Sequence, residues 1–280
     1  MRTIDAHHHL WGPAACREPW LAGEELRPLR RGFTPAELAA EAAAAGVDTT
    51  VVVQTVSRTE ETSELLALAA RGGRIAGVVG WVDLSAPDVA DAVAALREGP
   101  GGAHLVGIRH QVQDEADPQW LERPEVLRGL RAVARAALGY DLLVRPHQFP
   151  SAVAAVDAVP ELAFTLDHLG KPPVAAGGLG PWAAGLSLLA ERPNVTAKLS
   201  GLVTEADWQH WSIADLRPFA DTALHRFGPG RLMFGSDWPV CTLAAPYGEV
   251  LDAARALTAE LTEDERAAVL GGTAARVYGV

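Results

Sequence analysis

The sequence predicts an α/β protein, a single (β/α)8 barrel with a parallel eight-stranded core that spans residues 1–280. Eight short runs rich in β-branched residues recur about 33 residues apart, the length of one strand–helix unit. Several runs, such as 50–53 and 77–82, are continuously apolar, which is typical of strands that helices cover on both faces. The strict alternation favours a barrel. An open doubly wound sheet is the alternative, because a sequence does not show whether a sheet closes.

The expected strands can be placed in chain order. They are 3–7, 50–54, 77–82, 105–110, 141–145, 163–167, 195–199 and 232–235. No linker, low-complexity tract or charge block divides them, so we expect one domain. The longest connecting stretches are 11–32, 112–123 and 169–179. Each follows a predicted strand, at the end where barrel active sites are built.

Four of the intervening helices have recognisable ends. Thr34 and Glu37 form a capping box with proline at the first helical position, and Gly46 closes that helix. The others are a helix opened by Ser-Ala-Pro-Asp at 85–88 and ended at Gly99, one over 124–139, and a final helix capped by Thr262-Glu-Asp-Glu. These signals place helices between strands, as the barrel requires.

The composition limits the class of function. Lys plus Arg number 24 and Asp plus Glu 35, which gives a net charge of −11. This balance argues against binding to nucleic acid or to an anionic membrane surface. Cys16 and Cys241 are too few for a disulfide framework, and no apolar run reaches the roughly 18 residues of a membrane span. We expect a cytoplasmic protein with a small-molecule substrate; a homo-oligomer is possible, since barrel surfaces leave no period in the sequence.

The first predicted strand ends in Asp-Ala-His-His-His. Because side chains alternate along a strand, we expect His7 and His9 to share a side with Asp5, and His8 to point away. Two imidazoles at this spacing can converge on one metal ion. The alternative is a pair of buried core histidines.

Three further predicted strands deliver titratable groups where they end. These are His147 after the fifth strand, His168 after the sixth and Asp237 after the eighth. Together with the first-strand pair they suit one Zn²⁺ or similar ion with an open position for water, with His7, His9, His147 and Asp237 as expected ligands. Asp237 can also act as general base on that water. No lysine lies in 105–112, which argues against a dinuclear site bridged by a carbamylated lysine.

Several motifs carry a family resemblance over nearly the whole chain. They are DAHHHLW at 5–11, GWVDL at 80–84, GIRH at 107–110, DHLGKP at 167–172, KLSG at 198–201, FGSDWPV at 234–240 and GGTAARVYG at 271–279. In this order they resemble the amidohydrolase superfamily, in its amidohydrolase-2 branch of sugar-lactonase-like proteins. The resemblance implies a (β/α)8 barrel that opens the ring ester of a sugar-acid lactone, such as a rhamnono- or fucono-lactone.

The resemblance also implies roles for residues. It places His7 and His9 at the first-strand pair, His168 at the sixth-strand histidine and Asp237 at the eighth-strand aspartate, whereas relatives need not carry a histidine at His147. Asp237 takes a proton from water and returns it to the ring oxygen, and His168 orients the carbonyl or the water. The carbonyl is polarised by a divalent metal, Zn²⁺ first, or by the histidines without a metal.

Four side chains are candidates for binding the substrate. Arg109, Arg145 and Lys198 are donors for hydroxyls or a carboxylate, and Trp81 can stack on a sugar ring. Arg109 has a structural alternative, an ion pair with Asp5 or Asp83. We expect Ser236 and Cys241, which flank the eighth-strand aspartate, to be a hydrogen-bonding neighbour and a packing residue.

Two other functions remain open. A metal-dependent decarboxylase of an aromatic or enol acid uses a similar histidine and aspartate arrangement in the same branch. The other is a non-catalytic carbohydrate-binding barrel, which would leave the acid–base groups without a function. Product analysis distinguishes the decarboxylase from the lactonase, because decarboxylation releases CO₂ whereas lactone opening releases one acid equivalent.

Overall fold

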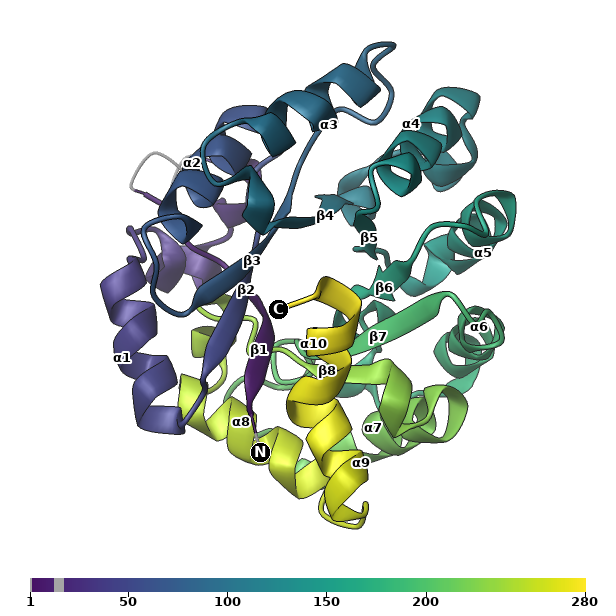
Figure 1. Ribbon diagram of the computed structural model, residues 1–280. Helices are drawn as coiled ribbons and strands as arrows, with labels where there is room; N and C mark the ends of the chain where they lie inside the picture. The colour runs from purple at the N-terminus through teal and green to yellow at the C-terminus, as the bar shows by residue number, and fades with distance from the viewer. Residues whose placement is uncertain (1, 13–17) are drawn as a thin grey trace.

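A parallel sheet of eight strands stands at the centre of the molecule in the computed structural model, which describes residues 2–12 and 18–280 (Figure 1). The strands neighbour one another in chain order, and a parallel bridge between His8 and Trp238 brings the last strand beside the first. The sheet therefore closes, and the predicted (β/α)8 barrel is confirmed over the open sheet. The strands are β1 Ile4–His8, β2 Thr49–Val53, β3 Ile75–Gly80, β4 Leu105–His110, β5 Gly139–Leu142, β6 Phe164–Leu166, β7 Val195–Leu199 and β8 Leu232–Phe234.

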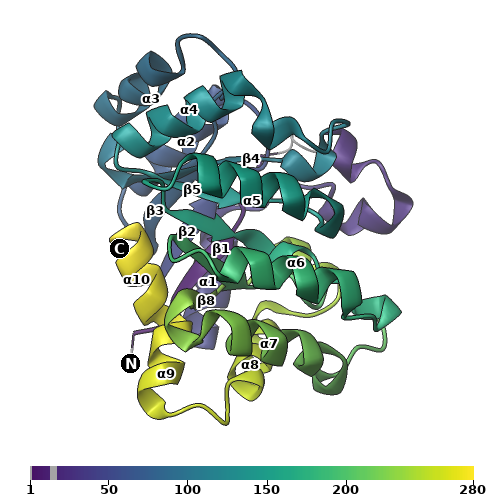
Figure 2. The ribbon, with the colours of Figure 1, turned by 90° about the vertical axis from the view of Figure 1, so that its right-hand side faces the viewer.

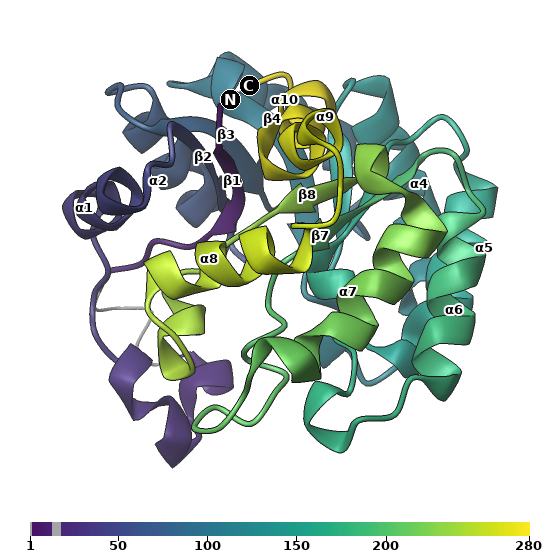
Figure 3. The ribbon, with the colours of Figure 1, turned by 90° about the horizontal axis from the view of Figure 1, so that it is seen from below.

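A helix follows each strand and covers the outside of the barrel (Figure 1). These helices are α1 Pro35–Ala45, α2 Thr59–Ala69, α3 Val89–Glu98, α4 Pro124–Arg135, α5 Phe149–Ala158, α6 Gly180–Ala190, α7 Ile213–Phe227 and α8 Tyr247–Leu257. Two short helices, α9 Glu263–Ala267 and α10 Thr273–Tyr278, follow them. Figures 2 and 3 show α9 and α10 beside both termini at one end of the barrel, with the 3-10 segments that follow β1 at the other.

Two predicted helix caps are present. Glu37 N donates to Thr34 Oγ1 while Glu37 accepts from Thr34 N at 2.8 Å, and Gly46 ends α1 in the left-handed region at φ 74°. Thr262 forms the same reciprocal pair at the start of α9. Each box satisfies backbone N–H groups that the first helical turn leaves without a partner.

Several predicted element bounds differ from the structure by more than one residue. The stretch 85–88 precedes α3 instead of forming its first turn, because Ser85 donates to the Asp83 carboxylate at 2.6 Å in a turn of its own. The predicted helix 124–139 ends at Arg135, and the fifth strand starts at Gly139, two residues before the predicted 141. Ala137 turns the chain between them at a positive φ of 54°.

The inside of the barrel is apolar at the end nearest the termini. Its side chains come from alternating positions of the strands and are closed off by α10: Ile4, Ala6, Val51, Val53, Val79, Met233, Ala274 and Tyr278. A larger apolar cluster fills the space between the sheet and the helices. Within the described residues, no helix is both long enough and apolar enough to cross a membrane.

A fully buried set of charges lies above this apolar layer. The ammonium of Lys198 on β7 donates to Asp141 Oδ2 at 2.5 Å, and it lies 3.1 Å from His7 Nδ1 and 3.0 Å from Asp167 Oδ1. Tyr278 of α10 donates to Asp141 at 2.9 Å. Burial alone would lower the pKa of Lys198, but the two carboxylates outweigh it and hold that pKa above its usual value.

Replacing Lys198 by methionine tests this arrangement. Lys198→Met leaves two buried carboxylates without their shared cation, so we expect a loss of about 3–5 kcal/mol in the free energy of unfolding. Urea denaturation measures it. Lys171→Met is the matched control, because the ion pair of Lys171 with Glu205 is partly exposed and contributes about 1 kcal/mol at most. Equal losses in the two variants would contradict the argument.

Candidate active site

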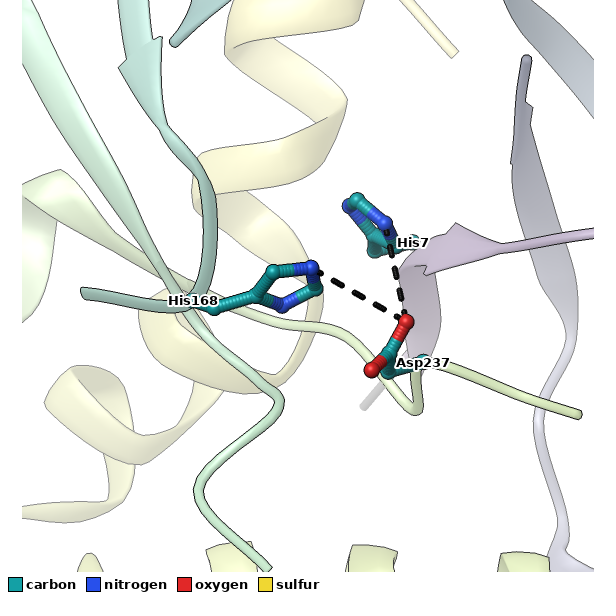
Figure 4. A group of neighbouring side chains, drawn as sticks. All are labelled: His7, His168 and Asp237. Carbon is teal, nitrogen blue, oxygen red and sulfur yellow. Dashed lines mark ion pairs between the residues drawn. The ribbon is translucent and has the colours of Figure 1, made fainter. Parts of the chain in front are cut away.

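Four of the predicted site residues meet where β1, β6 and β8 end. Asp237 Oδ1 lies 3.4 Å from His9 Nε2, 3.8 Å from His7 Nε2 and 3.9 Å from His168 Nε2. The Nε2 atoms of His7 and His9 are 3.2 Å apart. Figure 4 shows His7, His168 and Asp237 pointing toward one another. All four side chains are buried, so the arrangement is set by the protein interior and not by solvent.

The end of β1 departs from simple alternation. The register with β2 shifts between Asp5 and His8, so His7 and His9 share a side but Asp5 does not lie on it. Asp5 instead accepts hydrogen bonds from Ser236 Oγ at 2.6 Å and from Tyr247 OH of α8 at 2.9 Å. The prediction that Asp5 shares a side with His7 and His9 was therefore wrong. The irregular pairing interrupts the alternation of side chains between Asp5 and His8.

His8 and Ser236 lie behind the site. His8 points away from the cluster, as expected, and its Nε2 lies 3.0 Å from Thr50 Oγ1. Ser236 is held to Asp5 through both its backbone N–H and its hydroxyl. Ser236 is thus a hydrogen-bonding neighbour that fixes the loop carrying Asp237.

Hydrogen bonds set the orientation of two of the rings. His9 Nδ1 lies 2.9 Å from the carbonyl oxygen of Val53, which can only accept, so the neutral ring carries its proton on Nδ1 and leaves Nε2 with a free lone pair. His168 Nδ1 lies 2.8 Å from Ser200 Oγ. His168 and Asp237 also have positive φ values of 52° and 58°, which the surrounding structure must impose on residues other than glycine.

The protonation states follow from burial. Burial lowers the pKa of His168 to about 4 and lowers the pKa of His7 well below its usual value. Burial would raise the pKa of Asp237, but the rings of His168, His9 and His7 hold that pKa below its usual value. At neutral pH the cluster therefore presents neutral His7 and His168 imidazoles and an ionised carboxylate.

This set of atoms fits a divalent metal. His7, His168 and Asp237 each offer one ligand atom, and these atoms lie within 4.8 Å of one another. His9 Nε2, whose lone pair is free, adjoins them. Neutral imidazole nitrogens and one carboxylate oxygen are the ligands that Zn²⁺ takes in catalytic sites.

His147 and Arg145 lie elsewhere. Strand β5 ends at Leu142, and the chain turns into a 3-10 segment, Pro146–Gln148, on which His147 is exposed; Arg145, just before it, is exposed too. Neither lines the pocket described below. Strand β5 thus stops too early to aim His147 into the pocket, and the role of His147 as a ligand stays a prediction.

A pocket of about 110 Å³ opens over the cluster. Its lining residues are His9, Trp20, Thr55, Arg109, Gln111, Gln113, Leu143, His168, Lys171, Asp237 and Val240. Arg109 faces inward and its Nη1 donates to Asp167 Oδ2 at 3.1 Å, so its ion-pair partner is neither Asp5 nor Asp83. Arg109 keeps its place as a candidate for binding the substrate, since it also reaches the pocket.

Two other candidates do not reach this pocket. Lys198 is fully buried next to His7, and its ammonium is paired with Asp141 and Asp167. Trp81 donates through Nε1 to His110 at 2.9 Å. Neither residue lines the pocket, and their roles in binding the substrate stay predictions.

Three polar residues of the pocket were not predicted from the sequence. Thr55, Gln111 and Gln113 directly follow the second and fourth strands, a position that could have singled them out. Cys241 is buried, and burial raises the pKa of its thiol, which agrees with packing. Cys16 lies outside the described residues.

Comparisons with known proteins agree with this site. The family model described as Amidohydrolase matches residues 4–280. An L-fucono-1,5-lactonase of Burkholderia multivorans is 42% identical over 99% of this chain and 96% of its own length. An L-fucono-1,5-lactonase of Burkholderia ambifaria is 37% identical over 99% and 95%.

A solved structure gives the same result in three dimensions. The crystal structure of an amidohydrolase from Burkholderia multivorans with bound Zn superposes with a TM-score of 0.94, at 42% identity and over 100% of both chains. The fold, the motifs and the family model thus agree over the whole described length, and the chain belongs to the amidohydrolase family.

Proposed function

We propose that the protein is a lactonase that hydrolyses the ring ester of a sugar-acid lactone, with L-fucono-1,5-lactone as the leading substrate. The observation that carries the proposal is the ionised Asp237 carboxylate among histidine rings in a pocket at the end of the barrel. The 42% identity to an L-fucono-1,5-lactonase supports the choice of substrate.

Asp237 is the general base and then the general acid. Its carboxylate is ionised at neutral pH and accepts a proton from water as the water attacks the lactone carbonyl carbon. The resulting carboxylic acid is strong, because the surrounding rings favour the ionised form. It therefore gives its proton readily to the ring oxygen, which leaves as a much more basic alkoxide.

His168 and Arg109 stabilise the charge that forms on the carbonyl oxygen. With Ser200 Oγ donating to Nδ1, the neutral His168 ring carries its proton on Nε2 and donates it to that oxygen. Arg109 adds a fixed positive charge on the pocket wall, held in place by Asp167. Both groups are in position before the reaction, so they need no reorganisation.

We infer that His7, His9, His168 and Asp237 are the ligand set for Zn²⁺, with His147 left out. When bound, the ion supplies Lewis-acid polarisation of the carbonyl and lowers the pKa of a bound water. The alternative is that the histidine rings and Arg109 polarise the carbonyl without a metal. The hydrogen bond to Val53 orients the His9 ring for either task. For His168, Nε2 is a ligand only when Ser200 Oγ accepts the proton of Nδ1, so the two tasks require opposite tautomers of this ring.

Asp237→Asn tests the proposed reaction. The amide cannot accept the proton of the water, so we expect kcat to fall about 1000-fold on L-fucono-1,5-lactone. Acid release, followed with a pH indicator over a panel of sugar lactones, measures it. Asp207→Asn is the control, because Asp207 is exposed and away from the cluster. Release of CO₂ from an aromatic acid, with no lactone opened, would move the protein to the decarboxylase class.

His9→Asn tests the metal site without reference to activity. We expect the wild type to bind one Zn²⁺ per chain, and the variant to bind it at least about 100-fold more weakly, because one ligand is lost. Competition with a chromophoric chelator measures the affinity. His210→Asn, an exposed histidine, is the control. Equal zinc affinity in all three proteins would remove His9 from the ligand set.

Lactone turnover before and after chelation then decides what polarises the carbonyl. We expect activity to fall on zinc removal and to return when zinc is added back. Full activity of the zinc-free protein would assign the polarisation to the histidines and Arg109.

A further inference from the structure

The pocket has a second wall, from which the proposed chemistry uses only Arg109 of β4. The reacting groups lie where β1, β6 and β8 end, whereas Thr55 and Gln113 follow β2 and β4. In a closed barrel whose eight strands neighbour one another in chain order, β2 faces β6 and β4 faces β8. Thr55 therefore lies across the pocket from His168, and Gln113 lies across it from Asp237.

This wall carries polar atoms that lack a protein partner. Thr55 Oγ1 and Gln113 Oε1 are buried and have no hydrogen-bond partner among the described residues. Thr55 is 3% exposed. A buried hydroxyl or carbonyl without a partner costs free energy that a bound ligand can recover. The two atoms form one hydrogen-bonding surface, because both residues line the same pocket.

Both residues are held rigidly by their backbones. Glu61 of α2 accepts from Thr55 N at 2.8 Å and from Val56 N at 2.9 Å. Gln113 N donates to Leu143 O at 3.0 Å, and the buried Gln148 donates to the Val112 carbonyl at 2.7 Å. The loops after β2 and β4 are thus anchored while Thr55 Oγ1 and Gln113 Oε1 keep no partner, although Gln113 Nε2 donates to Asp114 Oδ2 at 3.4 Å. Such anchoring is expected of a preformed binding surface.

The chemistry of the two atoms selects the ligand group. Thr55 Oγ1 can donate and accept, and Gln113 Oε1 can only accept. A hydroxyl does both, so ring hydroxyls suit both atoms, whereas a carboxylate has no proton to donate to the Gln113 oxygen. The lactone carbonyl is directed to the wall of His168 and Asp237, which leaves the hydroxyl-bearing carbons toward Thr55 and Gln113.

We propose that Thr55 and Gln113 are specificity-determining residues that bind ring hydroxyls of the sugar lactone opposite the reacting carbonyl. The inference rests on the proposed function and adds the residues that select a polyhydroxylated ring. It makes Thr55 and Gln113 binding groups and assigns them no proton transfer.

The test compares two lactones of the same ring size. L-fucono-1,5-lactone carries ring hydroxyls, and δ-valerolactone has none. We expect Thr55→Val and Gln113→Met to lower kcat/KM for the sugar lactone about 10-fold or more and to leave kcat/KM for δ-valerolactone unchanged. Thr55→Ser, which keeps the hydroxyl, should retain most of the wild-type value.

Two control variants change the same residue types outside the pocket. Thr222→Val changes a residue on α7, and Gln119→Met replaces an exposed glutamine. We expect both variants to have the wild-type kcat/KM for both lactones. An equal loss on both lactones in the Thr55 and Gln113 variants, or no loss on either, would overturn the inference while the lactonase function stands.

Binding of a stable sugar tests the recognition of ring hydroxyls separately from lactone hydrolysis. L-fucose has the ring hydroxyls but no ester, and its Kd is measured by calorimetry in the wild type, Thr55→Val and Gln113→Met. We expect the variants to bind about 10-fold more weakly or worse. If no lactone is opened by the wild type, the proposed function fails, and an unchanged Kd in these variants would then reject the hydroxyl-binding role independently.

Discussion

The buried ammonium of Lys198 links the two ends of the barrel. It joins Asp141, which also accepts from Tyr278 of the terminal helix, to His7 in the active site. A charge in the apolar interior is tolerated only when paired, so Lys198 and its two aspartates must occupy their places together. The position of His7, and with it the distance to Asp237, depends on this paired set.

The irregular end of β1 is the second requirement of the site. A regular strand would place successive odd-numbered residues on one side, and Asp5 would then compete for the space near His7. The register shift directs Asp5 to Ser236 and Tyr247 instead. Asp5 thereby fixes the segment after β8 from behind, so one strand both supplies two site histidines and holds the loop that carries Asp237.

The active site thus separates two tasks by strand. The ends of β1, β6 and β8 supply neutral imidazoles and an ionised carboxylate, the groups that the proposed function uses to move protons and to hold a metal. Beside Arg109, the segments after β2 and β4 supply Thr55 and Gln113, uncharged polar residues that suit hydroxyls. In a closed barrel these ends face one another across a single pocket, so loops on one side can vary in specificity without disturbing the chemistry on the other.

The sequence by itself determined the barrel, the order of its elements and four site residues. Strand spacing, apolar runs and capping boxes are local signals, and His7, His9, His168 and Asp237 end strands within the family motifs. Only the tertiary structure decided which way the other side chains point and how deeply they are buried. It buried Lys198 between carboxylates, exposed Arg145 and His147, turned Asp5 away and placed Thr55 and Gln113 in the pocket. The reason is physical: one residue of difference in where a strand stops or bulges reverses a side chain's direction, and long-range pairing sets that residue.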